Sequence, residues 1–206
     1  ARANFTMFWS ALRPLLEGNS EALARLDAIR EGFGAVMSQA IEAMWASKLG
    51  LSRYDADLVN ELLELMVRSK ADYTMVFRRL SALPAGIPEH LAALKESFYE
   101  PSSEDLDAQW TQWLGRWREQ ITANGDLRET SAAMQRLNPA ITWREWLIAP
   151  AYEQAAQGDT SLIQELQAVF RHPYEAPSAE LAATYDRLKP REFFHAGGVS
   201  HYSCSS

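Results

Sequence analysis

Residues 55–81 read DADLVNELLELMVRSKADYTMVFRRLS, and their pattern indicates an all-helical protein. Its apolar residues recur every three or four positions, the spacing that places side chains on one face of a helix. They are Leu58, Leu62, Leu63, Leu65, Met66, Tyr73, Val76, Phe77 and Leu80. We expect two helices here, or one kinked helix, joined near residues 69–72.

The second half of this stretch carries its charged residues at its two ends. Asp72 precedes the apolar positions, and Arg78 and Arg79 follow most of them. These signs complement the dipole of a short helix, whose N-terminus favours an acid and whose C-terminus favours a base. Tyr73 and Phe77 share a face and are expected to pack inward. We predict a structural role for these residues, with contact of the arginines to substrate or to another lobe as the alternative.

In the rest of the chain, apolar residues recur at helical spacing almost throughout. No run of alternating apolar and polar residues is long enough to indicate a β-strand. Pro14 should bend or end a first helix, and Ser20 is expected to cap the second. Gly32 and Gly34 should break that second helix or mark a neighbour packed close to it, and Gly50 should end it in the left-handed conformation. Pro150 should bend or restart a later helix. Ser161 and Gln164 have the spacing of a capping box. Further helices are expected over 4–16, 20–49, 89–98, 106–123, 128–137, 142–157, 162–171 and 179–188. The fold class is all-α, with helices over 1–171 and a mostly irregular tail over 172–206.

Composition excludes several classes of function. The 206 residues include 47% hydrophobic residues, enough for a real core, and 20 basic against 27 acidic residues give a net charge of −7. This balance disfavours nucleic acid and anionic membrane surfaces as partners. No stretch approaches the roughly 20 apolar residues of a membrane span. One cysteine fits a reducing compartment, so we expect a cytoplasmic protein.

Motifs that carry chemistry are few. Gly32-Phe33-Gly34 lacks the third glycine of a phosphate-binding loop. Glu192 and His195 form one Glu-x-x-His pair, whereas a di-iron site needs two such pairs and two more carboxylates. Glu61 and Glu64 share a helical face and are read as a solvated surface, with a paired-carboxylate site as the alternative.

Three tryptophans line one face of the helix expected over 106–123. Trp110, Trp113 and Trp117 are three and four positions apart. Such a stripe is usually core, and the alternative is a pocket for a planar ligand.

Cys204 is the one cysteine, third from the end of a polar tail. It cannot form a disulfide within this chain, and no apolar run surrounds it to bury it. His201 lies close enough in sequence to favour the thiolate. Redox function and an ordinary tail thiol are the two interpretations. Because the chain opens at Ala1 rather than Met, we expect it to be a C-terminal piece of a larger protein.

Several strings, in order along the chain, resemble the C-terminal part of the selenoprotein O family, kinase-like protein adenylyltransferases. The strongest is Asp72-Tyr73-Thr74-Met75-Val76-Phe77-Arg78-Arg79-Leu80-Ser81. Others are Lys48-Leu49-Gly50-Leu51, Asn138-Pro139, Trp143-Arg144-Glu145-Trp146-Leu147, Gly158-Asp159, Pro173-Tyr174 and the terminal Cys204-Ser205-Ser206. Glu145 departs from the asparagine that is common in the family.

The resemblance implies that the chain is the helical C-terminal part of a kinase-like fold. The complete protein would bind ATP and Mg²⁺ and transfer AMP to serine, threonine or tyrosine hydroxyls of protein substrates. No catalytic, cofactor-binding or metal-binding residue of the family maps onto this sequence, so these residues would precede Ala1. This part alone would be inactive and bind no cofactor, and its partner would be the preceding kinase-like part. Cys204 would form a regulatory disulfide with an upstream cysteine.

Two other functions stay open. A stand-alone helical interaction module would receive a partner helix in a tryptophan-rich groove. A helical bundle that binds a small molecule would have a deep pocket near Trp110 and Trp117.

Overall fold

The computed structural model describes residues 1–86, 90–123 and 125–194. These residues form helices and connecting turns, and no strand longer than the single bridge between Ala71 and Phe98 occurs among them. The all-α prediction is confirmed. The chain divides into two compact units, residues 1–45 and 46–206. The predicted boundary after residue 171 stays a prediction.

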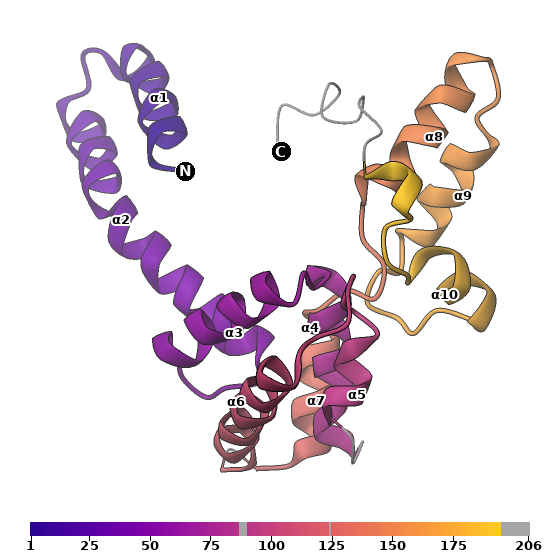
Figure 1. Ribbon diagram of the computed structural model, residues 1–206. Coiled ribbons are helices and arrows are strands. Elements are labelled where there is room, and N and C mark those ends of the chain that lie inside the picture. The colour runs from indigo at the N-terminus through magenta and orange to yellow at the C-terminus, as the bar shows by residue number, and fades with distance from the viewer. Residues whose placement is uncertain (87–89, 124, 195–206) are drawn as a thin grey trace. The chain divides into compact units, whose positions relative to one another are not determined.

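The first unit is a helical hairpin. Helix α1 (Arg2–Leu12) and the 3-10 helix η1 (Arg13–Leu16) fold back beside the first half of α2 (Ser20–Lys48) (Figure 1). The Phe5 and Phe33 rings stack at 4.0 Å, and the Trp9 indole donates to the Asp27 carboxylate at 3.0 Å. No side chain of α1 is buried.

Two expectations about α2 are wrong. The helix runs unbroken through Gly32 and Gly34. No neighbour lies close to the Cα of either glycine, because an added Cβ would meet nothing within 4 Å at Gly32 and only an Arg2 nitrogen at 3.9 Å at Gly34. The N-terminal cap is also one residue earlier than predicted, since the Asn19 side chain accepts the Ala22 N–H at 3.0 Å.

The second unit begins within the last turn of α2 and continues with the helices that residues 55–81 predict. Helix α3 (Ala56–Arg68) and helix α4 (Tyr73–Ala82) are separated by a turn, so the two-helix alternative is confirmed. Gly50 ends α2 with a φ of +67°, the left-handed conformation expected of a helix-ending glycine. The short η2 (Leu83–Ala85), α5 (His90–Lys95), α6 (Glu104–Thr122) and α7 (Leu127–Gln135) follow.

Helix α6 carries the main core of this unit. Trp110, Trp113 and Trp117 are at most 1% exposed, so their interpretation as core is confirmed. Each indole N–H is paired with an earlier segment: with the Ser69 hydroxyl at 2.7 Å, and with the Leu58 and Leu49 carbonyls at 2.8 Å. Pairing these polar atoms removes the cost of burying them.

The last helices form a second core. Helices α8 (Glu145–Ala156), α9 (Ser161–Val169) and α10 (Ala179–Tyr185) pack around it, and η3 (Arg191–Phe193) follows. Its buried members are Ala140, Ile141, Trp146, Leu147, Ala151, Leu166 and Tyr185. Helix α8 begins three residues later than predicted and continues through Pro150 without a restart. The predicted capping box is wrong, because Ser161 lies inside α9 and its N–H donates to Asp159 at 2.9 Å.

Candidate functional site

Asp72 ends the turn before α4 and caps the helix. Its Oδ1 accepts the Met75 N–H at 3.0 Å, and its own N–H donates to the Ser97 carbonyl at 2.8 Å. An acidic cap of this kind stabilises a helix by about 1 kcal/mol. The same residue therefore begins α4 and ties it to the segment after α5.

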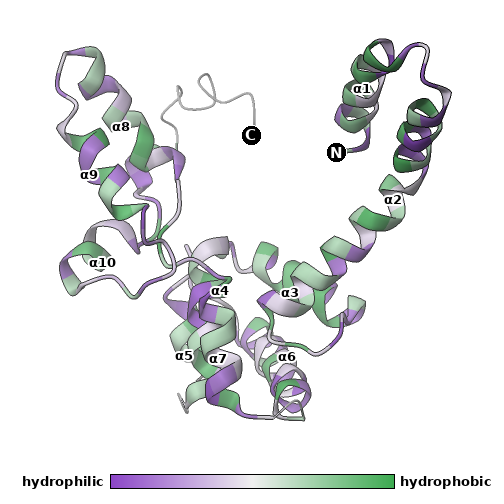
Figure 2. Cartoon of the chain, turned by 180° about the vertical axis from the view of Figure 1, so that it is seen from behind, coloured by the Kyte–Doolittle hydropathy of each residue, from purple (hydrophilic) through white to green (hydrophobic). Residues whose placement is uncertain are grey.

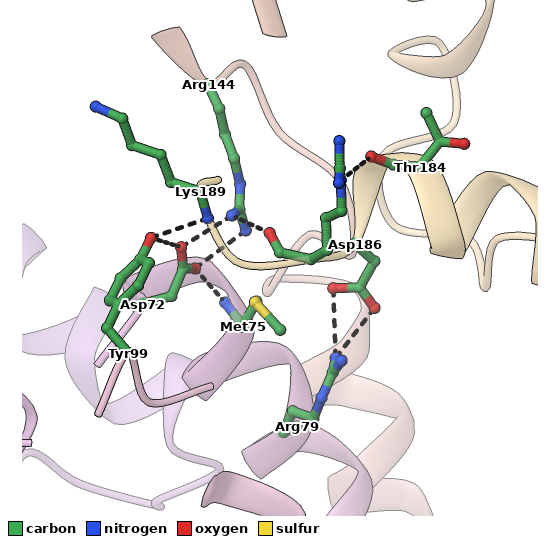
Figure 3. A network of polar contacts seen from close by, with 9 residues as sticks. Asp72, Met75, Arg79, Tyr99, Arg144, Thr184, Asp186 and Lys189 are labelled. Atoms are coloured by element: carbon green, nitrogen blue, oxygen red, sulfur yellow. Dashed lines mark hydrogen bonds and ion pairs between the residues drawn. The ribbon is translucent and has the colours of Figure 1, made fainter. Parts of the chain in front are cut away.

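The Asp72 carboxylate also forms a buried ion pair with Arg144, the residue just before α8. The guanidinium approaches both carboxylate oxygens, at 2.8 and 3.0 Å, and the two side chains are 12% and 9% exposed (Figure 3). Arg144 also donates to the Arg187 carbonyl at 3.0 Å. Two-pronged pairing of this kind fixes orientation as well as distance. The pair thus joins α4, α8 and the segment after α10.

Tyr99 adds to the contacts of Asp72 and Arg144. We call the group formed by these residues with Arg79, Asp186, Arg187 and Lys189 the junction. Its hydroxyl donates to Asp72 Oδ2 at 3.2 Å and accepts the Lys189 N–H, also at 3.2 Å. Burial raises the pKa of the Tyr99 phenol, and the Asp72 carboxylate adds to the effect. The phenol is therefore protonated at neutral pH, as its donation to Asp72 requires.

The two arginines of α4 bind different segments. Arg79 donates to both oxygens of Asp186 at 3.0 and 3.4 Å, and its side chain is 20% exposed. Arg78 donates to the Gln135 and Asn138 carbonyls at 3.1 and 3.2 Å. Both arginines thus contact residues at the end of α7 or in the segments that follow α7 and α10. Their contact with substrate or with another lobe stays a prediction.

Asn138 lies at the centre of a second polar cluster and is fully buried. Its amide group donates to the Lys48 carbonyl and to the Ser81 hydroxyl, each at 2.9 Å, and its oxygen accepts from Lys48 Nζ at 2.7 Å. Pro139 follows directly, four residues after the end of α7 at Gln135. Burial lowers the pKa of the Lys48 ammonium.

The face of α4 is buried only in part. Phe77 is 1% exposed, as expected, but Tyr73 is 47% exposed, so its predicted inward packing is wrong. The Tyr73 ring tilts onto Phe77 at 4.7 Å, and Lys48 Nζ lies 5.4 Å from its centroid. Tyr73 is at the first position of α4, where its ring covers Phe77 rather than entering the core.

The remaining candidates from the sequence are not brought together. Glu61 pairs with Arg116 rather than with Glu64. Glu192 is exposed, and His195 and Cys204 lie outside the described residues. Within residues 1–86, 90–123 and 125–194, no three histidine, cysteine or carboxylate side chains are grouped to hold a metal ion. None of the helices there has the length and apolar character needed to cross a membrane.

Sequence reasoning missed Arg144, Asp186, Tyr99 and Lys189 as members of this junction. A weak signal existed for Arg144: a cation directly before a helix opposes the dipole, so it needs a carboxylate nearby. Chemically, the junction positions segments. Each oxygen of Asp72 already has at least two partners, so this carboxylate is not placed to take a proton from a substrate.

Known proteins resemble this chain over most of its length. The sequence model of the family described as Protein adenylyltransferase SelO matches residues 1–171. A protein named Protein nucleotidyltransferase YdiU from Tolumonas auensis is 34% identical over 184 residues, which cover 85% of this chain and 34% of that protein. The protein of the same name from Methylobacillus flagellatus is 35% identical over 202 residues, 95% of this chain and 37% of that protein. The chain thus spans little more than a third of the length of these curated relatives.

Proposed function

Because this chain belongs to the SelO family of protein adenylyltransferases, we propose that it is the C-terminal helical part of an enzyme that transfers AMP from ATP to serine, threonine or tyrosine hydroxyls of proteins. One observation carries the proposal: the family model matches residues 1–171, yet the chain covers only about a third of its relatives. The catalytic residues then lie in the part of the protein that precedes Ala1.

The chemistry of the described residues supports this division. A site for Mg²⁺-bound ATP needs carboxylates that are free to bind the metal ion. The buried acids of the junction, Asp72 and Asp186, are instead paired with arginines. Asp72 and Asp186 are therefore not free to hold Mg²⁺. We assign the nucleotide and the metal to the preceding part of the protein.

The surface of the first unit supports a further protein partner. Apolar side chains along α1, η1 and α2 are 43–78% exposed, and Figure 2 shows hydrophobic residues along α1 and α2. They are Met7, Phe8, Leu15, Ile29, Val36, Ile41 and Met44. Exposed apolar surface of this extent commonly marks a contact surface. We assign this surface to contact with the preceding part of the same protein.

We also propose that the protein acts in the cytoplasm.

The test compares the intact protein with the 206-residue chain. Each is incubated with Mg²⁺, candidate protein acceptors and ATP labelled either on the α- or on the γ-phosphate. We expect the α-label alone to reach protein, and only with the intact protein. Transfer of the γ-label would identify a kinase instead. AMP transfer by the 206 residues alone would refute the assignment of catalysis to the preceding part.

We propose that Cys204 regulates this enzyme through a disulfide with a cysteine outside this chain. Reductant should change the rate of AMP transfer by the intact protein and leave the rate of its Cys204→Ser variant unchanged. Equal responses of the two proteins would contradict the disulfide.

The stand-alone interaction module stays the second candidate, and the exposed apolar residues of α1 and α2 are what favour it. This candidate predicts an intact protein that forms a stable complex with another protein and transfers neither label.

A further inference from the structure

A surface hollow of about 880 Å³ lies beside Tyr99, next to the Asp72–Arg144 pair. Basic and aromatic side chains line it, among them Lys70, Arg187, Lys189, Arg191, Tyr99 and Phe194. We call this feature the basic hollow. In Figure 3 the Lys189 side chain extends away from the Asp72–Arg144 pair. The volume of the basic hollow is within the range of pockets that hold small ligands, roughly 300–1,000 Å³.

The charge of the basic hollow is opposite to that of the whole chain. Among the described residues, four cations line it against one carboxylate, Glu100, an excess of three positive charges in a chain of net charge −7. Glu100 pairs with Lys70 at 2.7 Å. No ion pair among the described residues includes Arg187, Lys189 or Arg191. An anion in the hollow would therefore meet cations that no carboxylate of the described residues pairs with.

The wall that carries these cations is held in place by the junction. The Arg187 carbonyl accepts from Arg144 at 3.0 Å, and the Lys189 N–H donates to the Tyr99 hydroxyl at 3.2 Å. The Arg187 guanidinium lies 5.2 Å from the Trp146 ring, and its Nε donates to the Thr184 carbonyl at 3.0 Å. Because the backbone is anchored at both Arg187 and Lys189, this segment loses little conformational entropy when a ligand binds.

Two aromatic rings form another part of the wall. Tyr99 and Phe194 meet edge to face at 5.4 Å, and Lys189 Nζ lies 5.8 Å from the Phe194 ring centroid. Lysine and arginine together recognise phosphoryl oxygens, arginine through its planar pair of donors and lysine as a point charge. We propose that the basic hollow binds a small ligand that carries phosphoryl groups. The proposal does not rest on the transfer of AMP.

The test reads the hollow locally in the intact protein, with EDTA present. Pyrophosphate is titrated while lysines are acetylated by a short pulse of reagent, and acetylation of Lys189 is followed by mass spectrometry. We expect pyrophosphate to protect Lys189 and not Lys95, which is exposed and pairs with Asp107 outside the hollow. Inorganic phosphate and AMP are titrated in the same way. Tighter protection by AMP indicates a nucleotide, and tighter protection by pyrophosphate indicates a ligand recognised by its phosphates.

A variant series separates specific binding from general charge effects. Arg191→Gln should raise the half-protecting concentration of pyrophosphate about tenfold, because one charged contact is lost. Arg191→Lys should stay near the wild type, and so should Arg128→Gln, which removes an exposed cation outside the hollow. Circular dichroism shows whether each variant is folded.

Three results would overturn the proposal. The first is unchanged acetylation of Lys189 at millimolar pyrophosphate. The second is equal protection by sodium chloride at the same ionic strength, which would mean screening alone. The third is equal half-protecting concentrations in the wild type and in Arg191→Gln.

Discussion

Removing either partner of the Asp72–Arg144 pair should strongly destabilise the second unit. Asp72→Asn removes the charge and keeps a side chain that caps helices as well as aspartate does. Arg144 then stays buried at 9% exposure without its carboxylate. Asp72→Ala removes the charge and also the cap on Met75.

The magnitudes follow from burial. Breaking one side of a buried ion pair costs about 3–5 kcal/mol in the free energy of unfolding, and losing a helix cap costs about 1 kcal/mol more. We therefore expect about 3–5 kcal/mol for Asp72→Asn and about 1 kcal/mol beyond that for Asp72→Ala. Arg144→Ala should cost about as much as Asp72→Asn.

The assay is urea unfolding followed by tryptophan fluorescence, with Asp72→Ala, Arg144→Ala and the double variant in one cycle. We expect a coupling free energy of about 2 kcal/mol or more. The matched control is Lys70 with Glu100, an ion pair whose side chains are 60% and 58% exposed, for which about 0.5 kcal/mol is expected. Additive losses at residues 72 and 144 would refute the reasoning, because the two side chains would then not stabilise each other.

Three further predictions concern glycines and a buried phenol. Gly50→Ala should lower the free energy of unfolding by at least about 2 kcal/mol, because its φ is +67° and the new Cβ would lie 2.6 Å from Thr130 Cγ2; an unchanged urea midpoint would contradict this. Gly32→Ala should raise thermal stability by about 0.5–1 kcal/mol, since the site is helical with open space around it, and destabilisation would show a contact that the structure lacks. Burial and the bond to Glu165 raise the pKa of Tyr185 from 10.0 to about 12. The neutral phenol is favoured in the folded state. Its contribution to the free energy of unfolding is therefore complete below pH 10 and is lost as the pH rises through about 12. Urea midpoints should fall over this window less in Tyr185→Phe than in the wild type, and parallel curves would count against the shift.

Local patterns in the sequence predicted much of the fold. The spacing of apolar residues in α3, α4 and α6 indicates which face is buried, because one helical period relates all of them. Gly50 is equally local, since a helix that must turn sharply needs a left-handed residue at its end. The break expected at Gly32 failed for the opposite reason. A cost of about 1 kcal/mol per glycine is too small to interrupt a helix of 29 residues.

The junction could not be predicted because its partners are far apart along the chain. Asp72 and Arg144 are 72 residues apart, and Arg79 and Asp186 are 107 apart. The helical periodicity around Asp72 shows a cap and gives no information on which arginine will reach it. Tyr73 illustrates a second limit. The helical spacing places Tyr73 on the same face as the buried residues of α4. Tyr73 is the first residue of the helix, however, and the core does not extend far enough to cover it.

The three indole bonds of α6 have a consequence for how the protein is made. Leu49, Leu58 and Ser69 leave the ribosome 68, 55 and 41 residues ahead of the tryptophans that bind them. At roughly 5–20 residues per second, the growing chain carries the apolar face of α3 without α6 for several seconds. A chaperone that holds nascent helices would have this interval in which to act, and translation that stalls before Trp110 would release a species prone to aggregate.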